Sequence, residues 1–219
     1  MHTLYKHCII HMDPKHIQEL VKLNFVGEVR LYNENITSDV LKDLSFPDGT
    51  ESIDLSRNQI TTLEGVRFPE GLEYLNLSHN QITTLEGVRL PSTIITLNLS
   101  HNPNLTLTGV NDFLQLGWRK HRGPHHPMNQ LFLTRTKVTL KGDVCYMKNI
   151  PSYFAIHLNE GMYTNTRYVN EIEEACHEVI SKSEPGSFGA QVMQLKGGKK
   201  RQQKTKRQQK TKRQSKLKK

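Results

Sequence analysis

One segment of the sequence recurs almost unchanged after 22 residues. Asp54–Pro69 is followed by Asn76–Pro91, and ten consecutive residues are identical in the two copies. A third copy begins at Ile94, and a degenerate copy begins earlier, at Val29. A repeat of this length cannot bury its apolar side chains alone, so we predict that the copies stack on one another as a solenoid.

The leucines within each copy follow a known spacing. Leu72, Leu75, Leu77, Asn80 and Ile82 spell L-x-x-L-x-L-x-x-N-x-L, which resembles the leucine-rich-repeat family. The resemblance implies an α/β solenoid, in this case a short horseshoe with a parallel concave sheet. We expect a helical N-terminal cap, an α+β C-terminal cap and a disordered basic tail around it.

Two finer resemblances concern the same part of the chain, residues 29–110. The 22-residue length and the phrase Asn-Gln-Ile-Thr-Thr-Leu-Glu-Gly resemble the subclass found in phosphatase-1-regulatory and splicing-associated repeat proteins. The entry Phe68–Leu72 resembles repeat proteins encoded by giant DNA viruses of amoebae. The second resemblance implies an infected host cell or a virion as the setting.

Residues that alternate with the buried leucines of a strand point away from the core. Leu75 and Leu77 are expected to enter the core, so Tyr74 and Asn76 face outward onto the concave side. We predict that this face binds a protein partner; the alternative is that these are ordinary solvated strand positions. The predicted partner-binding residues are Arg30, Asp54, Tyr74, Asn76, Thr96 and Asn98.

One asparagine recurs where the chain leaves each strand, as Asn58, Asn80 and Asn102. An asparagine there can satisfy backbone groups of its own turn and of the adjacent repeat. We therefore predict a structural ladder and not a binding site. Ile60 and Ile82 are expected to fill the core from the return segments.

The segments outside the repeats differ in pattern. Leu4–Met12 is strand-like, and Asp13-Pro14 is a typical helix start. Phe113–Trp118 is expected to cover the last repeat, Leu131–Val144 to form one or two strands, and Asn165–Ser183 to form an amphipathic helix. The predicted organisation is an N-terminal cap (1–28), leucine-rich repeats (29–112), a C-terminal cap or small α+β addition (113–184), and a linker with a disordered basic tail (185–219).

Positive charge is concentrated at the C-terminus. Residues 199–219 hold twelve Lys or Arg and no acid, whereas the rest of the chain has eighteen basic and twenty-one acidic residues. Leu217 is the only apolar side chain there, so we expect disorder and binding to nucleic acid or another polyanion. An import signal and a merely solubilising tail are the alternatives. The predicted polyanion-binding residues are Lys199, Lys200, Arg201, Lys204, Lys206, Arg207, Lys210, Lys212 and Arg213.

Patterns typical of metal sites, disulfides and active sites are missing. The clusters from His7 to His11 and from His121 to His126 each lack a second ligand pair, so we predict no metal. Cys8, Cys145 and Cys176 show no paired spacing, which predicts no disulfide framework. No phosphate-binding loop, nucleophile elbow or zinc-protease motif occurs, so we expect neither catalysis nor a cofactor.

These patterns together predict a non-catalytic, leucine-rich-repeat scaffold that binds a protein partner, with a tail that tethers it to nucleic acid or another polyanion. One alternative is a nucleic-acid-binding or condensing protein whose repeats act as a spacer. Another is an enzyme housed in residues 113–184. No secretory signal or membrane-length apolar run is evident, so we expect an intracellular location in cytoplasm or nucleus.

Overall fold

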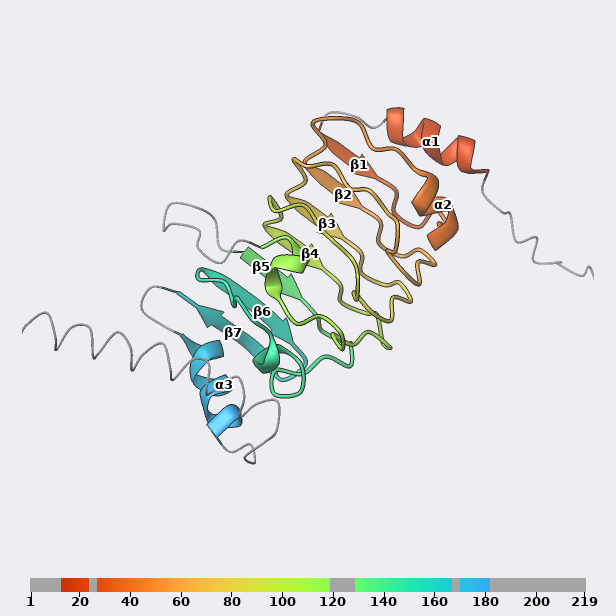
Figure 1. Cartoon of the computed structure of the whole chain (residues 1–219). Coiled ribbons are helices and arrows are strands. Elements are labelled where there is room, and N and C mark those ends of the chain that lie inside the picture. The colour runs from red at the N-terminus through yellow and green to blue at the C-terminus, as the bar shows by residue number, and fades with distance from the viewer. Residues whose placement is uncertain (1–12, 24–26, 119–128, 167–169, 182–219) are drawn as a thin grey trace, which may run out of the picture.

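A computed structural model describes residues 13–23, 27–118, 129–166 and 170–181 of the chain (Figure 1). Strands and irregular return segments alternate along it, with a helix at each end. The elements are α1 (Pro14–Leu23), β1 (Glu28–Arg30), α2 (Ser38–Asp43), β2 (Ser52–Asp54), β3 (Tyr74–Asn76), β4 (Thr96–Asn98), η1 (Phe113–Leu116), β5 (Asn129–Phe132), η2 (Val144–Tyr146), β6 (Phe154–Leu158), β7 (Gly161–Asn165) and α3 (Glu171–Ser181).

The seven strands of the described residues form one sheet whose order follows the chain. Strands β1 to β6 pair in parallel, and β7 pairs antiparallel with β6. Figure 1 shows the strands stacked along the molecule, with one turn of the chain leading from each strand to the next through the repeats. The predicted solenoid with a parallel sheet is therefore confirmed. One buried residue of each parallel strand forms a continuous row: Val29, Ile53, Leu75, Leu97, Leu131 and Ile156.

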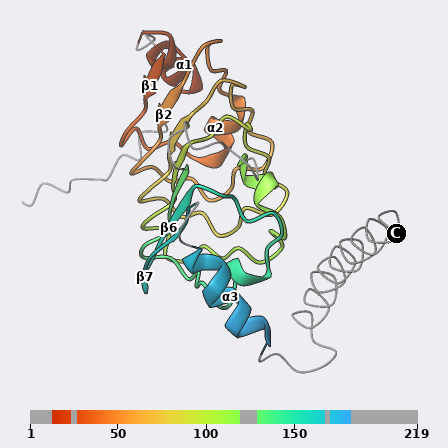
Figure 2. The ribbon, with the colours of Figure 1, turned by 90° about the vertical axis from the view of Figure 1, so that its left-hand side faces the viewer.

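A second buried row follows directly after the strands and consists of leucines. Leu55, Leu77 and Leu99, one from each clear copy of the repeat, are completely shielded from solvent. Return segments close the core from the other side, where Ile60 and Ile82 are equally inaccessible. Figure 2 shows the sheet along one side of the molecule and α2 and the return segments on the other. Burial of these apolar side chains between adjacent turns is what holds the solenoid together.

The recurrent asparagines form the expected ladder inside the turns. Asn80 donates from Nδ2 to the carbonyl oxygens of Leu55 and Leu77, both at 3.0 Å. Its Oδ1 accepts the backbone N–H of Ile60 at 3.0 Å. Asn102 repeats this arrangement one turn later, with Oδ1 accepting from Ile82 at 2.9 Å. Each asparagine thus joins its own turn to the preceding repeat, which confirms a structural role.

The N-terminal end carries the expected helix. α1 begins after Asp13, whose carboxylate accepts the backbone N–H of Lys15 at 3.0 Å. Ile17 and Val21 are buried against the first repeat. The predicted strand at Leu4–Met12 lies outside the described residues.

A second helix near this end was not expected from the repeat pattern. The first repeat is 24 residues long between paired strand positions, whereas the next two are 22 residues long. The two additional residues let α2 form after Thr37, whose hydroxyl accepts the backbone N–H of Val40 at 3.4 Å. The other clear repeats return without a helix.

The sheet continues beyond the proposed boundary at residue 112. β5 pairs with β4 through Leu131 and Leu97, and β6 then pairs with β5. The described residues 129–158 therefore extend the solenoid before β7 and α3 close its end. Phe113 and Trp118 do not cover a last repeat, because both contact the ring of Phe154 on β6, with centroid separations of 5.3 and 4.9 Å.

The helix predicted at Asn165–Ser183 is shorter than expected. Asn165 is the last residue of β7, and α3 begins at Glu171. The hairpin of β6 and β7 turns at Asn159 and Glu160, so that Leu158 pairs with Gly161. Asn165 pairs with Phe154 of β6, which places this residue in the hairpin and not in the helix.

The expectation that no disulfide forms was wrong, because two cysteines are bonded to each other. Cys145 at η2 is joined to Cys176 on α3, although 31 residues separate them in sequence. Both side chains are buried, and α3 packs directly against η2. Reducing compartments disfavour disulfides. An intracellular location stays a prediction, and this bond is the observation that weighs against it.

Candidate protein-binding face

The outward side of the parallel sheet carries two rows of side chains, because alternate strand residues face opposite sides. We call these two rows the sheet face. The first row is Glu28, Ser52, Tyr74, Thr96 and Gln130. The second row is Arg30, Asp54, Asn76, Asn98, Phe132 and His157. All six residues predicted to bind a partner belong to these rows.

The middle of the sheet face is hollowed. A shallow depression of about 270 Å³ crosses β1 to β5 on this side. The structure brings five of the six predicted residues together there, while Arg30 lies outside the depression. Its lining includes Asp54, Tyr74, Asn76, Thr96 and Asn98, together with Glu28, Ser52, Ile53, Leu75 and Phe132.

The polar side chains of the second row are oriented by their own turns. Asn76 and Asn98 accept the backbone N–H two residues onward through Oδ1, at 3.1 and 3.0 Å. Asp54 does the same for Ser56 at 2.9 Å and also accepts its hydroxyl at 2.6 Å. Because these oxygens are engaged, Nδ2 of each asparagine is the amide atom best placed to donate to a partner.

The charged end of the face is internally paired. Arg30 donates to Glu28 at 2.8 Å, and this hydrogen bond lowers the pKa of the Glu28 carboxyl from its usual value. The same bond raises the pKa of Arg30. Both side chains are largely exposed, so water and salt screen the pair and it contributes little to stability. Arg30 is therefore an ion-pair partner at the edge, set apart from the central depression.

Phe132 and His157 extend the face and were missed in the sequence. Their rings stack with centroids 4.1 Å apart and planes 10° from parallel. Burial lowers the pKa of His157, which favours the neutral imidazole. Leu131 and Leu133 flank Phe132 as Leu75 and Leu77 flank Asn76, and this alternation was the signal that could have identified it.

A larger depression lies on the other side of the molecule, between α2 and the next return segment. Its volume is about 570 Å³, and it is bordered by acidic and basic side chains together with the stacked rings of Phe46 and Phe68. It occurs beside the lengthened first repeat. The Lys42 side chain passes over Gly65 there, and its Cε would lie 2.9 Å from a Cβ added to Gly65. We attribute this depression to the two additional residues of that repeat, since its lining comes from one pair of turns.

Other predicted features lie outside the described residues or have no counterpart in them. The polyanion-binding residues from Lys199 to Arg213 and both histidine clusters fall in segments that the structure does not describe. Within the described part of the chain, no group of three or more His, Cys, Asp or Glu could hold a metal ion. No described helix has the length and apolar character that crossing a bilayer requires.

Comparison with known families agrees with this architecture. Residues 48–103 match the family model described as leucine rich repeat. No curated protein matches the chain. The matched segment spans β2 to β4, the part of the sheet with the clearest repeats. Residues 48–103 are therefore leucine-rich repeats, a class of module that is generally non-catalytic and serves protein interaction.

Proposed function

We propose that the chain is a non-catalytic scaffold that binds a protein partner through the sheet face. The observation that carries the proposal is the shallow depression lined by polar residues from consecutive repeats. Small-molecule sites enclose most of their ligand, whereas an open depression on a flat sheet suits the broader surface of another protein.

The composition of the face supports this assignment. Tyr74 is 45% exposed at the centre of the face, although large aromatic side chains are usually buried. Tyrosine is among the residues that most often anchor protein interfaces. Asn76 and Asn98, which are neighbours in the second row, offer amide donors beside Tyr74. An aromatic anchor surrounded by oriented polar groups is the usual organisation of a protein interface.

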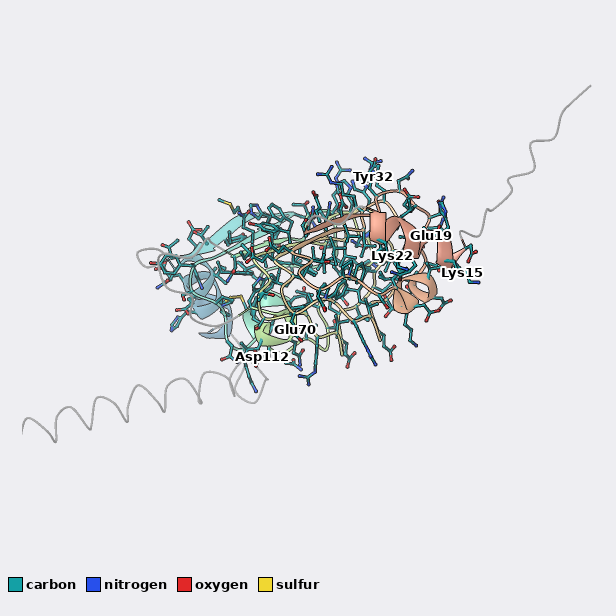
Figure 3. The ribbon with its side chains drawn as sticks, turned by 90° about the horizontal axis from the view of Figure 1, so that it is seen from above. Lys15, Glu19, Lys22, Tyr32, Glu70 and Asp112 are labelled. Carbon is teal, nitrogen blue, oxygen red and sulfur yellow. A yellow bond between two sulfur atoms is a disulfide. The ribbon has the colours of Figure 1, made fainter. Side chains whose placement is uncertain are left out.

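The proposal can be tested by comparing captured proteins from cells that express the chain. The test variant is Tyr74→Ala with Asn76→Ala. The control is Glu70→Ala, which changes an exposed residue away from the sheet face. Figure 3 shows Glu70 on the side of the molecule opposite Tyr32, which lies two residues after the end of β1. A partner that binds the face should be lost from the test variant, weakened about thirtyfold for an anchor worth 2 kcal/mol, and kept by the control. Equal retention by both variants would contradict the proposal.

The C-terminal tail is proposed to tether the scaffold to nucleic acid or another polyanion. Its twelve basic residues support this, and no aromatic side chain there could stack on bases. If about eight phosphates are neutralised, the logarithm of affinity for duplex DNA falls with the logarithm of salt at a slope of roughly −7. Salt-insensitive DNA binding by a chain lacking residues 198–219 would argue for a site in the body instead.

Two finer points remain proposals based on sequence. The 22-residue period supports the phosphatase-1-regulatory type of repeat, and the Phe68–Leu72 entry supports a relation to giant-virus repeat proteins. Neither changes the experiments above.

A further inference from the structure

A row of residues with left-handed backbone conformation borders the sheet face. One such residue lies three positions after the end of each strand from β1 to β5. Asn33, Arg57, His79, His101 and Arg135 have φ values between 55° and 59°. Residues other than glycine are uncommon in this conformation, although asparagine, aspartate and histidine are enriched among them. Four of the five turns nevertheless carry arginine or histidine. We call Arg57, His79, His101 and Arg135 the basic ladder.

Backbone hydrogen bonds hold the ladder at the spacing of the sheet. Arg57 donates its N–H to the carbonyl of Ser78, and His79 donates to that of Ser100, both at 3.0 Å. His101 donates to Thr134 at 2.9 Å. Neighbouring strands lie about 4.8 Å apart, so the four rungs span roughly 14 Å.

The two central side chains of the ladder lie over one another. The rings of His79 and His101 stack with centroids 3.8 Å apart and planes 19° from parallel. The guanidinium of Arg57 lies 5.9 Å from the ring centroid of Tyr32, which continues the row at its end. Stacked parallel imidazoles do not converge on one point, so this geometry does not favour a shared metal ion.

Positive charge in the ladder is not matched by the acids that the structure describes. The one described ion pair joins Arg30 to Glu28, away from the ladder. Asp54, on the neighbouring row, already accepts two hydrogen bonds from Ser56. The guanidinium groups of Arg57 and Arg135 thus have no described carboxylate partner, and an incoming anion would meet both.

The surroundings of His79 are consistent with an anion site. Burial, then the charges of His101, Arg57 and Arg135, lower the pKa of His79. These groups come from the turns after β2, β4 and β5. A carboxylate bound along the ladder would oppose this effect and raise the pKa of the imidazole, so binding would take up a proton.

We propose that the basic ladder binds an extended acidic segment of a protein partner. This inference rests on the proposed function and specifies the chemistry of the partner at one edge of the sheet face. An extended chain rises about 3.4 Å per residue, so four or five residues match the 14 Å of the ladder. Outside the tail the chain has eighteen basic and twenty-one acidic residues, which disfavours a long polyanion but permits a short acidic one.

The test uses the full chain and a fluorescent hexaglutamate peptide at low ionic strength, with hexaglutamine as the neutral reference. The test variant is Arg57→Gln with Arg135→Gln. The matched control is Arg67→Gln with Arg89→Gln, which removes the same charge from exposed positions in two return segments. Any binding by the tail is common to both variants, so their difference isolates the ladder.

The test variant should bind hexaglutamate about two- to thirtyfold more weakly than the control, the range expected for two exposed charge pairs. Replacing both arginines by lysine should preserve most of the affinity. Equal affinities of the test and control variants would overturn the proposal. The proposal would also be overturned if a single-stranded oligonucleotide bound more tightly than the peptide and its binding required Arg57 and Arg135.

A second measurement observes the wild-type ladder directly, so neither misfolding of a variant nor peptide binding by the tail can produce its signal. The ring protons of His79 and His101 are titrated by NMR with and without hexaglutamate, with His79→Gln and His101→Gln for assignment. Peptide binding should raise the pKa of His79, and affinity should therefore increase as pH falls from 7.5 to 6. Unchanged titrations would refute the ladder. Loss of partner capture in the Tyr74→Ala variant is measured separately. It tests binding by the sheet face independently of binding by the basic ladder.

Discussion

Replacing Asn80 by alanine tests whether the asparagine ladder joins the repeats. The substitution removes the acceptor of the buried Ile60 N–H, which has no other described partner once Oδ1 is gone. The carbonyls of Leu55 and Leu77 each keep a second asparagine donor, Asn58 at 2.8 Å and Asn102 at 3.1 Å. One orphaned donor costs about 1–3 kcal/mol and the two weakened carbonyl bonds about 1 more, so we expect a loss of about 3 kcal/mol.

The shared carbonyl makes a sharper prediction. In Asn80→Ala with Asn102→Ala, Leu77 O loses both asparagine donors. The double variant should then be less stable than the sum of the single variants by about 1–2 kcal/mol. Asn58 and Asn102 share no carbonyl, so their double variant should be additive within roughly 0.5 kcal/mol.

Urea unfolding followed by far-UV circular dichroism gives the four free energies of each cycle. The exposed Gln81→Ala is the control for a change in the same turn. Equal coupling in the two cycles, or a loss below 1 kcal/mol for Asn80→Ala, would refute the idea that these amides connect successive turns.

Three further substitutions test other parts of the fold. Cys145→Ser should lower the free energy of unfolding by roughly 3–4 kcal/mol, because the bond to Cys176 closes a loop across 31 residues. Reduced wild-type protein should unfold like the variant, and alkylation of both thiols in the native oxidised protein would contradict the disulfide. Gly117→Ala should destabilise the insertion before β5, since φ is +83° and a Cβ would collide with the carbonyl of Pro91; an unchanged thermal midpoint would count against this. Leu77→Ala should cost about 3–5 kcal/mol in urea unfolding, as expected for a fully buried leucine, and a cost under 1 kcal/mol would mean that the rung is not packed.

Much of the sheet face was predictable because the 22-residue period carries it. Leu75 and Leu77 alternate with Tyr74 and Asn76, so which side each residue faces follows from local pattern alone. The recurrence of Asn80 at fixed spacing likewise predicted the ladder. Local periodicity is sufficient here because each repeat meets only its neighbours.

The far end of the solenoid followed no such period. Between Leu97 and Leu131, paired residues of β4 and β5, the chain inserts twelve more residues than in the clear repeats. The alternation over Leu131–Val144 predicted a strand that overlaps β5, but the insertion hid its pairing with β4, and β6 was not predicted. Phe132 and His157 were therefore not assigned to the face.

The sequence by itself determined that leucines stack in turns and which side chains of the clear repeats face outward, because both follow from residue order within one turn. Only the tertiary structure decided that Cys145 meets Cys176, and that His79 stacks on His101 in a row of basic side chains. These contacts join residues of different turns, so they depend on how the turns align in space, a property that spacing within one turn does not contain.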